Sequence, residues 1–309
     1  MMYSGENHAT IVCRAKIAKE TSGMPDIYAH YVFGEKMKKA MPEEIKKAAL
    51  YDEELYEIGL HGPDILFYYK LPVGRKINKI GYAMHERPGR EFFEQAAAYV
   101  RRAEGEAKDR ALSYMIGFLF HYTLDRACHG YVQKKMEASR VSHSVVETEF
   151  DRYLLVKDGK TPLREKLTGH LVPSRKNASV IRHFFPGVRT EQLESTLKSM
   201  VLYNDIFVSR NPVVRGLTKT LMGVSGDYKG LRGLLMNAGE DKKCRDSSLR
   251  MEKLLDQAVQ TGCELSVNLL HYLEGTEELD ERFTSTFGAG DNWRRIPVLS
   301  YEEELLYEV

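Results

Sequence analysis

The chain has 309 residues, enough for one large domain or two ordinary ones, and 43% of them are hydrophobic, so we expect a substantial core. Its 45 Lys and Arg residues nearly balance its 44 Asp and Glu residues, and the net charge of +1 excludes a general electrostatic attraction to nucleic acid or to an anionic membrane. No window of about 18 uncharged apolar residues occurs, so we expect no membrane-spanning helix.

The N-terminal segment has no clear periodicity. Residues 1–23 lack the continuous apolar core of a secretory leader, and we expect them to form a disordered extension. The cysteines show no CxxC pairing and are expected to stay reduced; they are Cys13, Cys128, Cys244 and Cys263. Reduced thiols and the missing leader pattern predict a cytoplasmic location.

The rest of the chain has helical patterns, because apolar residues recur at a spacing near 3.6. The first helix is predicted over residues 26–40, with Asp26 as its N-cap. Further helices are predicted at residues 43–59, 89–104, 109–133, 143–155, 163–170, 174–184, 190–209, 212–222, 247–274 and 278–286. Breaks are predicted at residues 62–64, 70–81, 86–89, 156–162 and 223–230. Since strand alternation is weak, the sequence predicts an all-α fold, a multi-helix bundle.

One predicted helix carries a row of polar side chains. In the segment HYTLDRACH, His121, Asp125 and His129 are spaced i, i+4 and i+8. At about 100° per residue these positions drift by only about 40° per step, so they share one stripe of the helix. The surrounding segment, SYMIGFLFHYTLDRACHGYV, is otherwise apolar. Polar groups in such a helix are costly to bury unless they are paired or bind a metal, and the row therefore indicates a metal site.

A second helix carries a histidine and a carboxylate on one face. The segment HSVVE places His143 and Glu147 at i and i+4, and with His129 they offer three ligands and an open position, as catalytic zinc requires. A second site is predicted from four residues, Asp64, His85, His121 and Asp125. Asp125 has two carboxylate oxygens and can bridge two ions about 3.5–4 Å apart, a spacing suited to holding a phosphoryl group for in-line attack.

These segments together resemble a known enzyme family. The sequences MPDIYAH, GLHGPDILFYY, INKIGYAMHE, FHYTLDRACHGYV and SHSVVETEFDRYL are similar to the bacterial zinc-dependent phospholipase C family. Its all-helical trinuclear-zinc fold is shared distantly with fungal single-strand-specific nucleases. The resemblance covers residues 24 to about 155, and it keeps the order and approximate spacing of the ligands.

The resemblance implies a role for each candidate ligand. One zinc ion would be held by Asp64, His85, His121 and Asp125, and a second by His129, His143 and Glu147. His30 corresponds to the histidine of a third ion, with Asp125 shared. Asp64 also corresponds to a candidate general base for the attacking water, although a ligand and a base compete for the same lone pairs. The implied cofactor is zinc, as two or three ions, and a mixed histidine and carboxylate set also accepts manganese or iron.

The third ion site departs from the family pattern. Secreted members ligate this ion through an N-terminal tryptophan that is freed by leader cleavage. Here the only tryptophan is Trp293, and 29 residues precede His30. The third site is therefore expected to be weak, completed by water, or helped by a side chain such as Asp26. The two-metal core does not depend on it.

All the candidate ligands lie before residue 148. We therefore expect a metal-binding helical core over residues 24–160 and a helical remainder over residues 161–309 that packs on it, with one continuous domain as the alternative. Four further histidines have no partner pattern and are expected at the surface or in the core; they are His61, His170, His183 and His271.

The functional prediction is a zinc-dependent phosphoester hydrolase of phospholipase C type, in which metal-activated water attacks a phosphodiester. The expected substrate is a small phosphoester or a phospholipid head group, no stable nucleic-acid complex is expected, and membrane contact is peripheral at most. The alternatives are a nuclease or nucleotide phosphodiesterase on the same scaffold, and a non-catalytic metal-binding helical protein.

Overall fold

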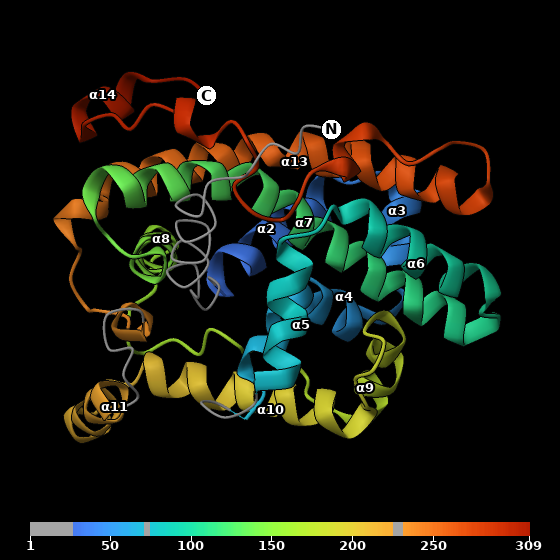
Figure 1. Cartoon of the computed structure of the whole chain (residues 1–309), viewed down its shortest axis with the longest axis horizontal. Helices are drawn as coiled ribbons and strands as arrows, with labels where there is room; N and C mark the ends of the chain where they lie inside the picture. Colours follow the sequence, from blue (N-terminus) through green and yellow to red (C-terminus); the bar gives the residue numbers. More distant parts are fainter. Residues whose placement is uncertain (1–26, 71–74, 225–230) are drawn as a thin grey trace, which may run out of the picture.

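The computed structural model describes residues 27–70, 75–224 and 231–309. Within these ranges the chain forms twelve α-helices and no β-sheet (Figure 1). The predicted all-α fold is thereby confirmed. Asp26 and the predicted extension over residues 1–23 lie outside the described ranges. None of the described helices combines the length and the apolar composition needed to cross a bilayer.

The α-helices are joined by turns and by longer loops. In chain order they are α2 (Ile27–Ala40), α3 (Glu43–Ala49), α4 (Glu53–Gly59), α5 (Arg75–His85), α6 (Gly89–Arg102), α7 (Gly105–Ser139), α8 (His143–Lys157), α9 (Arg175–Ile181), α10 (Thr190–Phe207), α11 (Pro212–Val224), α13 (Arg245–Glu274) and α14 (Tyr301–Leu306). Several 3-10 segments connect them, including η1 (Leu50–Asp52), η2 (Gly62–Tyr68) and η6 (Glu281–Thr284).

Two of the predicted helices are wrong or much shorter in the structure. Residues 163–170 form turns instead of a helix, and Leu163 has a φ of 65°, which an α-helix does not accept. Residues 278–286 contain only the 3-10 segment η6. Conversely, the predicted break at residues 70–81 contains most of α5.

One predicted helix is divided. Residues 43–59 form α3, the turn η1 and α4, because the Asp52 side chain accepts a hydrogen bond of 3.2 Å from the backbone N–H of Leu55 and thereby starts a new helix.

Helix α7 is the centre of the molecule. All its residues from Ser113 to Asp125 are buried, as expected for a helix that is surrounded by other elements. Helices α2, α4, α6 and α13 pack on it (Figure 1). Elements from both halves of the sequence therefore cover the segment that carries the polar row.

Two glycines allow α4 and α7 to cross at close range. A Cβ added at Gly117 of α7 would lie 2.1 Å from the carbonyl oxygen of Tyr56, and one added at Gly59 of α4 would lie 2.5 Å from that of Tyr114. Only glycine permits this backbone approach. Because η2 follows α4 almost directly, the crossing brings η2 onto α7.

One amide side chain of helix α5 forms hydrogen bonds to the backbone of η2. Nδ2 of Asn78 donates to the carbonyl oxygens of Leu66 and Phe67, at 3.1 and 2.6 Å. The C-terminal end of α5, where His85 lies, is thereby placed beside Asp64 of η2.

Candidate metal centre

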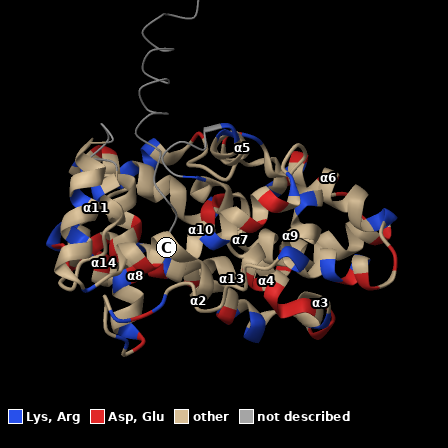
Figure 2. Ribbon diagram, turned by 90° about the horizontal axis from the view of Figure 1, so that it is seen from below, with Lys and Arg blue, Asp and Glu red and all other residues tan. Residues whose placement is uncertain are grey.

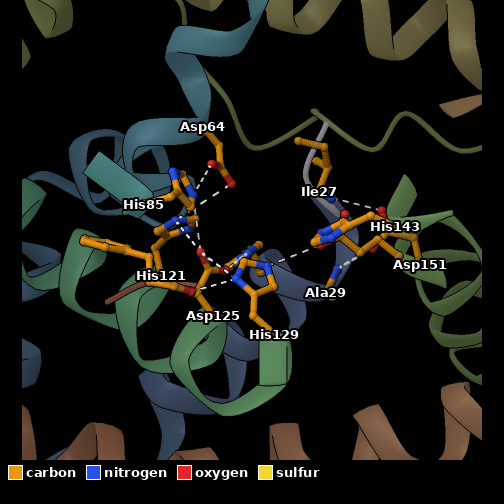
Figure 3. Close-up of polar contacts among 12 residues, drawn as sticks. Ile27, Ala29, Asp64, His85, His121, Asp125, His129, His143 and Asp151 are labelled. Atoms are coloured by element: carbon orange, nitrogen blue, oxygen red, sulfur yellow. Dashed lines mark hydrogen bonds and ion pairs between the residues drawn. The ribbon is translucent and has the colours of Figure 1, made fainter. Parts of the chain in front are cut away.

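The structure brings the predicted ligands together in two groups of nitrogen and oxygen atoms, each group within 4.8 Å (Figure 3). The first group is Asp64, His85, His121 and Asp125, and the second is His129, His143 and Glu147. They come from η2, α5, α7 and α8. The sequence assigned the same residues to the same two sites.

In the first group the carboxylate oxygens lie between the two imidazoles. Oδ1 of Asp64 lies 3.0 Å from Nε2 of His85, and its Oδ2 lies 3.8 Å from Nε2 of His121. Oδ2 of Asp125 lies 3.5 Å from Nε2 of His85 and 3.2 Å from Nε2 of His121. Four donor atoms from three separate segments thus face one small volume, in the mixture of nitrogen and oxygen that zinc accepts.

In the second group Glu147 lies between two histidines. Its Oε1 lies 2.6 Å from Nε2 of His143 and 3.4 Å from Nε2 of His129. The three residues would supply three protein ligands, which leaves a fourth tetrahedral position for water or substrate.

His30 approaches the two groups from α2. Its Nε2 lies 3.3 Å from Oδ1 of Asp125, whereas Oδ2 of Asp125 faces His121 and His85. The two oxygens of Asp125 therefore point in different directions, as a bridging carboxylate requires. The resemblance assigned these two residues to the third ion.

Several buried polar atoms of these groups make no hydrogen bond. Both ring nitrogens of His121 are in this state although its side chain is fully buried, and so are Oδ2 of Asp125 and Oε2 of Glu147. A buried polar atom without a partner is costly. Since Nε2 of His121 and Oδ2 of Asp125 lie 3.2 Å apart without hydrogen-bond geometry, a cation between them satisfies both atoms, and the residues present fit zinc.

Backbone carbonyls fix the orientation of two histidines. Nδ1 of His85 donates to the carbonyl oxygen of Gly81 at 2.8 Å, and Nδ1 of His129 donates to that of Phe287 at 2.7 Å. A hydrogen on Nδ1 leaves the lone pair on Nε2, the atom that faces the carboxylates. Phe287 lies far along the chain, so the C-terminal region takes part in positioning a ligand.

The carboxylates and imidazoles shift one another's pKa values. Burial alone would lower the pKa of His129, but Asp125 and Glu147 outweigh it and raise that pKa to about 9. Burial alone would raise the pKa of Glu147, but His143 and His129 lower it to about 2. Likewise burial alone would lower the pKa of His85, but Asp64 and Asp125 outweigh it and hold that pKa well above its usual value. Glu147 is therefore ionised at neutral pH and ready to bind a cation.

The absence of a side chain at Gly62 leaves room for the imidazole ring of His121. This glycine has a φ of +44°, and a Cβ added to it would lie 2.1 Å from Cδ2 of the His121 ring. The turn that presents Asp64 thus runs directly against the imidazole of another ligand.

One residue next to the site has no counterpart among the sequence predictions. Asp151 is buried on α8 and accepts hydrogen bonds from the backbone N–H groups of Ile27, Tyr28 and Ala29, at 2.9, 3.1 and 2.7 Å (Figure 3). It therefore caps the first turn of α2, immediately before His30. The sequence signal that could have identified Asp151 is its i, i+4 spacing from Glu147. Burial raises the pKa of Asp151 to about 7 against the effect of these N–H groups.

Two histidines without a partner pattern in the sequence contact each other. Nε2 of His61 and Nε2 of His170 lie 2.7 Å apart, and Tyr31 stacks on the His170 ring. Burial lowers the pKa of His61 well below its usual value and that of His170 to about 3, so both rings are neutral and one donates to the other. No short-range pattern could have revealed this pair, since 109 residues separate its members.

A comparison with protein families agrees with this geometry. The model of the family described as zinc dependent phospholipase C matches residues 29–196, which is more than half of the chain and includes every candidate ligand. The chain belongs to the zinc-dependent phospholipase C family. No curated protein and no solved structure matches it.

Membership confirms the predictions about the chemistry. The family is one of metal-dependent phosphoesterases, so the chain is an enzyme with a zinc cofactor and two candidate ligand clusters. The family match ends at residue 196, and α11, α13 and α14 follow it.

Proposed function

We propose that the protein hydrolyses a phosphodiester of a phospholipid, with His30, Asp64, His85, His121, Asp125, His129, His143 and Glu147 as the ligands of two or three zinc ions. The observation that carries this proposal is the unequal exposure of the ligands. The side chains of Asp64, His121 and Asp125 are at most 4% exposed, whereas those of the three other histidines of the two groups are 14–18% exposed. Solvent and substrate therefore reach the cluster from the histidine side.

This arrangement supports a catalytic site over a structural one. Structural zinc is enclosed by four protein ligands, whereas the group of His129, His143 and Glu147 offers three and lies partly at the surface. Zinc, when bound, supplies Lewis acidity, which lowers the pKa of water toward about 7 and polarises phosphoryl oxygens.

We assign Asp64 the role of general base for the attacking water. Its carboxylate is buried, and its two oxygens face different histidines, with Oδ1 at 3.0 Å from His85 and Oδ2 at 3.8 Å from His121. The more distant oxygen, Oδ2, is the one that can accept a proton while the other serves as a ligand. The hydrogen bond from His85 to Gly81 keeps the imidazole still while this occurs.

The experiment is a substrate panel on the purified zinc-loaded protein. Phospholipids with different head groups, bis-(para-nitrophenyl) phosphate, para-nitrophenyl phosphate and single-stranded DNA are compared at equal enzyme, with and without EDTA. We expect cleavage of the phosphodiesters, loss with EDTA and recovery with added zinc. Preferential cleavage of DNA would support the nuclease alternative, and no hydrolysis by protein with a full zinc content would support a non-catalytic metal protein.

We also propose a cytoplasmic location. It is supported by Cys244 and Cys263, which are free thiols in the described structure. Fractionation of cells that express the tagged full chain tests it, and recovery of the protein from the culture medium would contradict it.

A further inference from the structure

Helix α11 has an apolar stripe that faces solvent. Val213, Leu217, Leu221 and Val224 are 66, 62, 71 and 82% exposed. At about 100° per residue they fall within about 80° of one another around the helix. Isolated exposed apolar residues are common, but a row of four on one helix face marks an interaction surface.

The rest of the described structure covers little of this helix. Met222 is its only buried residue, and α11 lies at one end of the molecule, beside α10 (Figures 1 and 2). No described element packs on the stripe, since each of its four members is more than 60% exposed. The helix also lies beyond the family match, which ends at residue 196.

The charges around α11 have one sign. From residue 206 to residue 226 the sequence contains no Asp or Glu but contains Arg210, Arg215 and Lys219. The chain as a whole is almost neutral, at +1, whereas this segment, which is flanked by Asp205 and Asp227, carries +3. Lys219 and Arg210 are exposed and Arg215 is partly exposed. Basic side chains that lie within a Debye length of an anionic lipid surface contribute to its binding.

We propose that α11 docks the enzyme onto a phospholipid surface that contains anionic lipids. In this arrangement the stripe enters the boundary between head groups and acyl chains, and the helix lies in the plane of the membrane, as amphipathic interfacial helices do. The basic residues stay at the level of the phosphates, because their long aliphatic stems let the charged ends extend into the head groups. The inference rests on the proposed function, since a phospholipid substrate is presented at such a surface.

A second copy of the chain fits the stripe less well. A stable protein interface takes about 800 Å² from each partner, far more than four aliphatic side chains supply.

The test uses the double variant Leu217→Asp/Leu221→Asp and the control Leu306→Asp. Leu306 of α14 is 87% exposed, so the control adds one of the double variant's two negative charges at an exposed leucine elsewhere. Binding is measured by sedimentation with vesicles of phosphatidylcholine plus phosphatidylglycerol and of phosphatidylcholine alone. Hydrolysis of bis-(para-nitrophenyl) phosphate is measured on the same samples.

We expect the wild type and the control to bind the anionic vesicles, and the double variant to bind at least about tenfold more weakly, because each buried CH₂ group contributes a factor of about four. All three proteins should hydrolyse the soluble ester equally. If the wild type does not bind the vesicles but cleaves the soluble ester, the docking proposal is wrong and the proposed function stands. If none cleaves the soluble ester, the proposed function fails whatever the vesicles show.

Two further results would overturn the docking proposal. The first is equal weakening by Leu306→Asp, which would show that any added negative charge suffices. The second is a wild type that does not bind vesicles but forms a dimer without lipid, as detected by light scattering, while the double variant stays monomeric. This result would assign the stripe to a second copy of the chain.

Discussion

Helices α7 and α11 carry rows with the same i, i+4, i+8 spacing but with opposite relations to solvent. The row from His121 to His129 on α7 places polar groups inside the core, whereas the row from Val213 to Leu221 on α11 places apolar groups in water. Each row is costly when the chain is alone: the inner one leaves polar atoms without partners, and the outer one exposes a hydrophobic face.

Neither row is satisfied by the described residues alone. A cation satisfies the inner row, and an apolar surface satisfies the outer row. The inner row lies within the family match over residues 29–196 and the outer row lies beyond it. The family match therefore covers the candidate metal ligands, whereas the proposed docking helix lies outside it.

The largest effect on zinc content and activity is expected when a ligand of the inner row is removed. His121→Ala removes one of four donors of the first group, and we expect zinc content and hydrolysis to fall together. Activity should fall at least about a hundredfold, more than the loss that is typical when an outer-shell partner of a metal is removed. Elemental analysis and a phosphodiester assay measure the two quantities, and vesicle binding through α11 should not change.

The control for this prediction is His271→Ala. His271 lies on α13, is 44% exposed and pairs with Glu277, far along the chain from the cluster. Full zinc content in the His121→Ala protein would contradict the assignment.

A smaller effect is expected when the space around His121 is filled. Gly62→Ala places a Cβ 2.1 Å from the imidazole at a φ of +44°, whereas Gly105→Ala has a similar φ of +52° and nothing within 4 Å. Both variants incur a strain of about 1–3 kcal/mol, but only the first displaces a ligand. We expect both to lower the melting temperature and only Gly62→Ala to weaken zinc binding in a competition titration. Equal zinc affinity in the two variants would contradict the role given to Gly62.

The inner row could be predicted from the sequence because its signal is local. A helix repeats every 3.6 residues, so His121, Asp125 and His129 reveal their common face without any knowledge of the fold. The common helix face of His143 and Glu147 could be predicted for the same reason. What joined these segments into one site was the resemblance to a family, and the structure brought the same residues together.

The features that the sequence did not reveal depend on distant contacts. Asp151 acts on backbone N–H groups more than 120 residues away, and a backbone group has no signature in a sequence. Helix α5 was missed because it is short, rich in Lys and Arg, and interrupted by Gly81; tertiary hydrogen bonds from Asn78 hold it on η2. The predicted helix at 163–170 failed because its first residue, Leu163, has a positive φ that an α-helix does not accept.

Asp151 offers a test that separates the third ion from the other two. Asp151→Ala removes the acceptor for three N–H groups at the start of α2, which we expect to cost about 2 kcal/mol of folding free energy and to loosen His30. Zinc bound through His30 and Asp125 should be lost first, so the stoichiometry measured by elemental analysis should fall by up to one ion while the two-metal core remains.

Asp158→Asn is the matched control for that prediction. Asp158 also contacts α2, but through the hydroxyl of Tyr28 at 2.6 Å, and it caps no backbone group of that helix. The control should keep the zinc content of the wild type. An Asp151→Ala protein with unchanged zinc content would contradict a positioning role for Asp151.

The smallest effect concerns pH. In the metal-free protein the pKa of His129 is raised from 6.5 to about 9 by Asp125 and Glu147, which outweigh burial, so the ring holds a proton at neutral pH. Zinc needs the neutral imidazole, and binding must therefore release that proton. Zinc affinity should rise with pH up to about 9, by at most about tenfold per pH unit for this one proton. Calorimetry in buffers with different ionisation enthalpies measures the release.

The same shift acts on the metal-free fold with the opposite sign. A group whose folded pKa is raised contributes stability that is complete below its unfolded pKa and is lost as pH rises through the folded value. The melting temperature of the metal-free protein should therefore fall between pH 6.5 and about 9, while zinc affinity rises over the same window. Glu147→Gln removes one of the two carboxylates that raise this pKa, so both dependences should move to lower pH in that variant. If neither quantity changes across the window, His129 is not held by these carboxylates in solution.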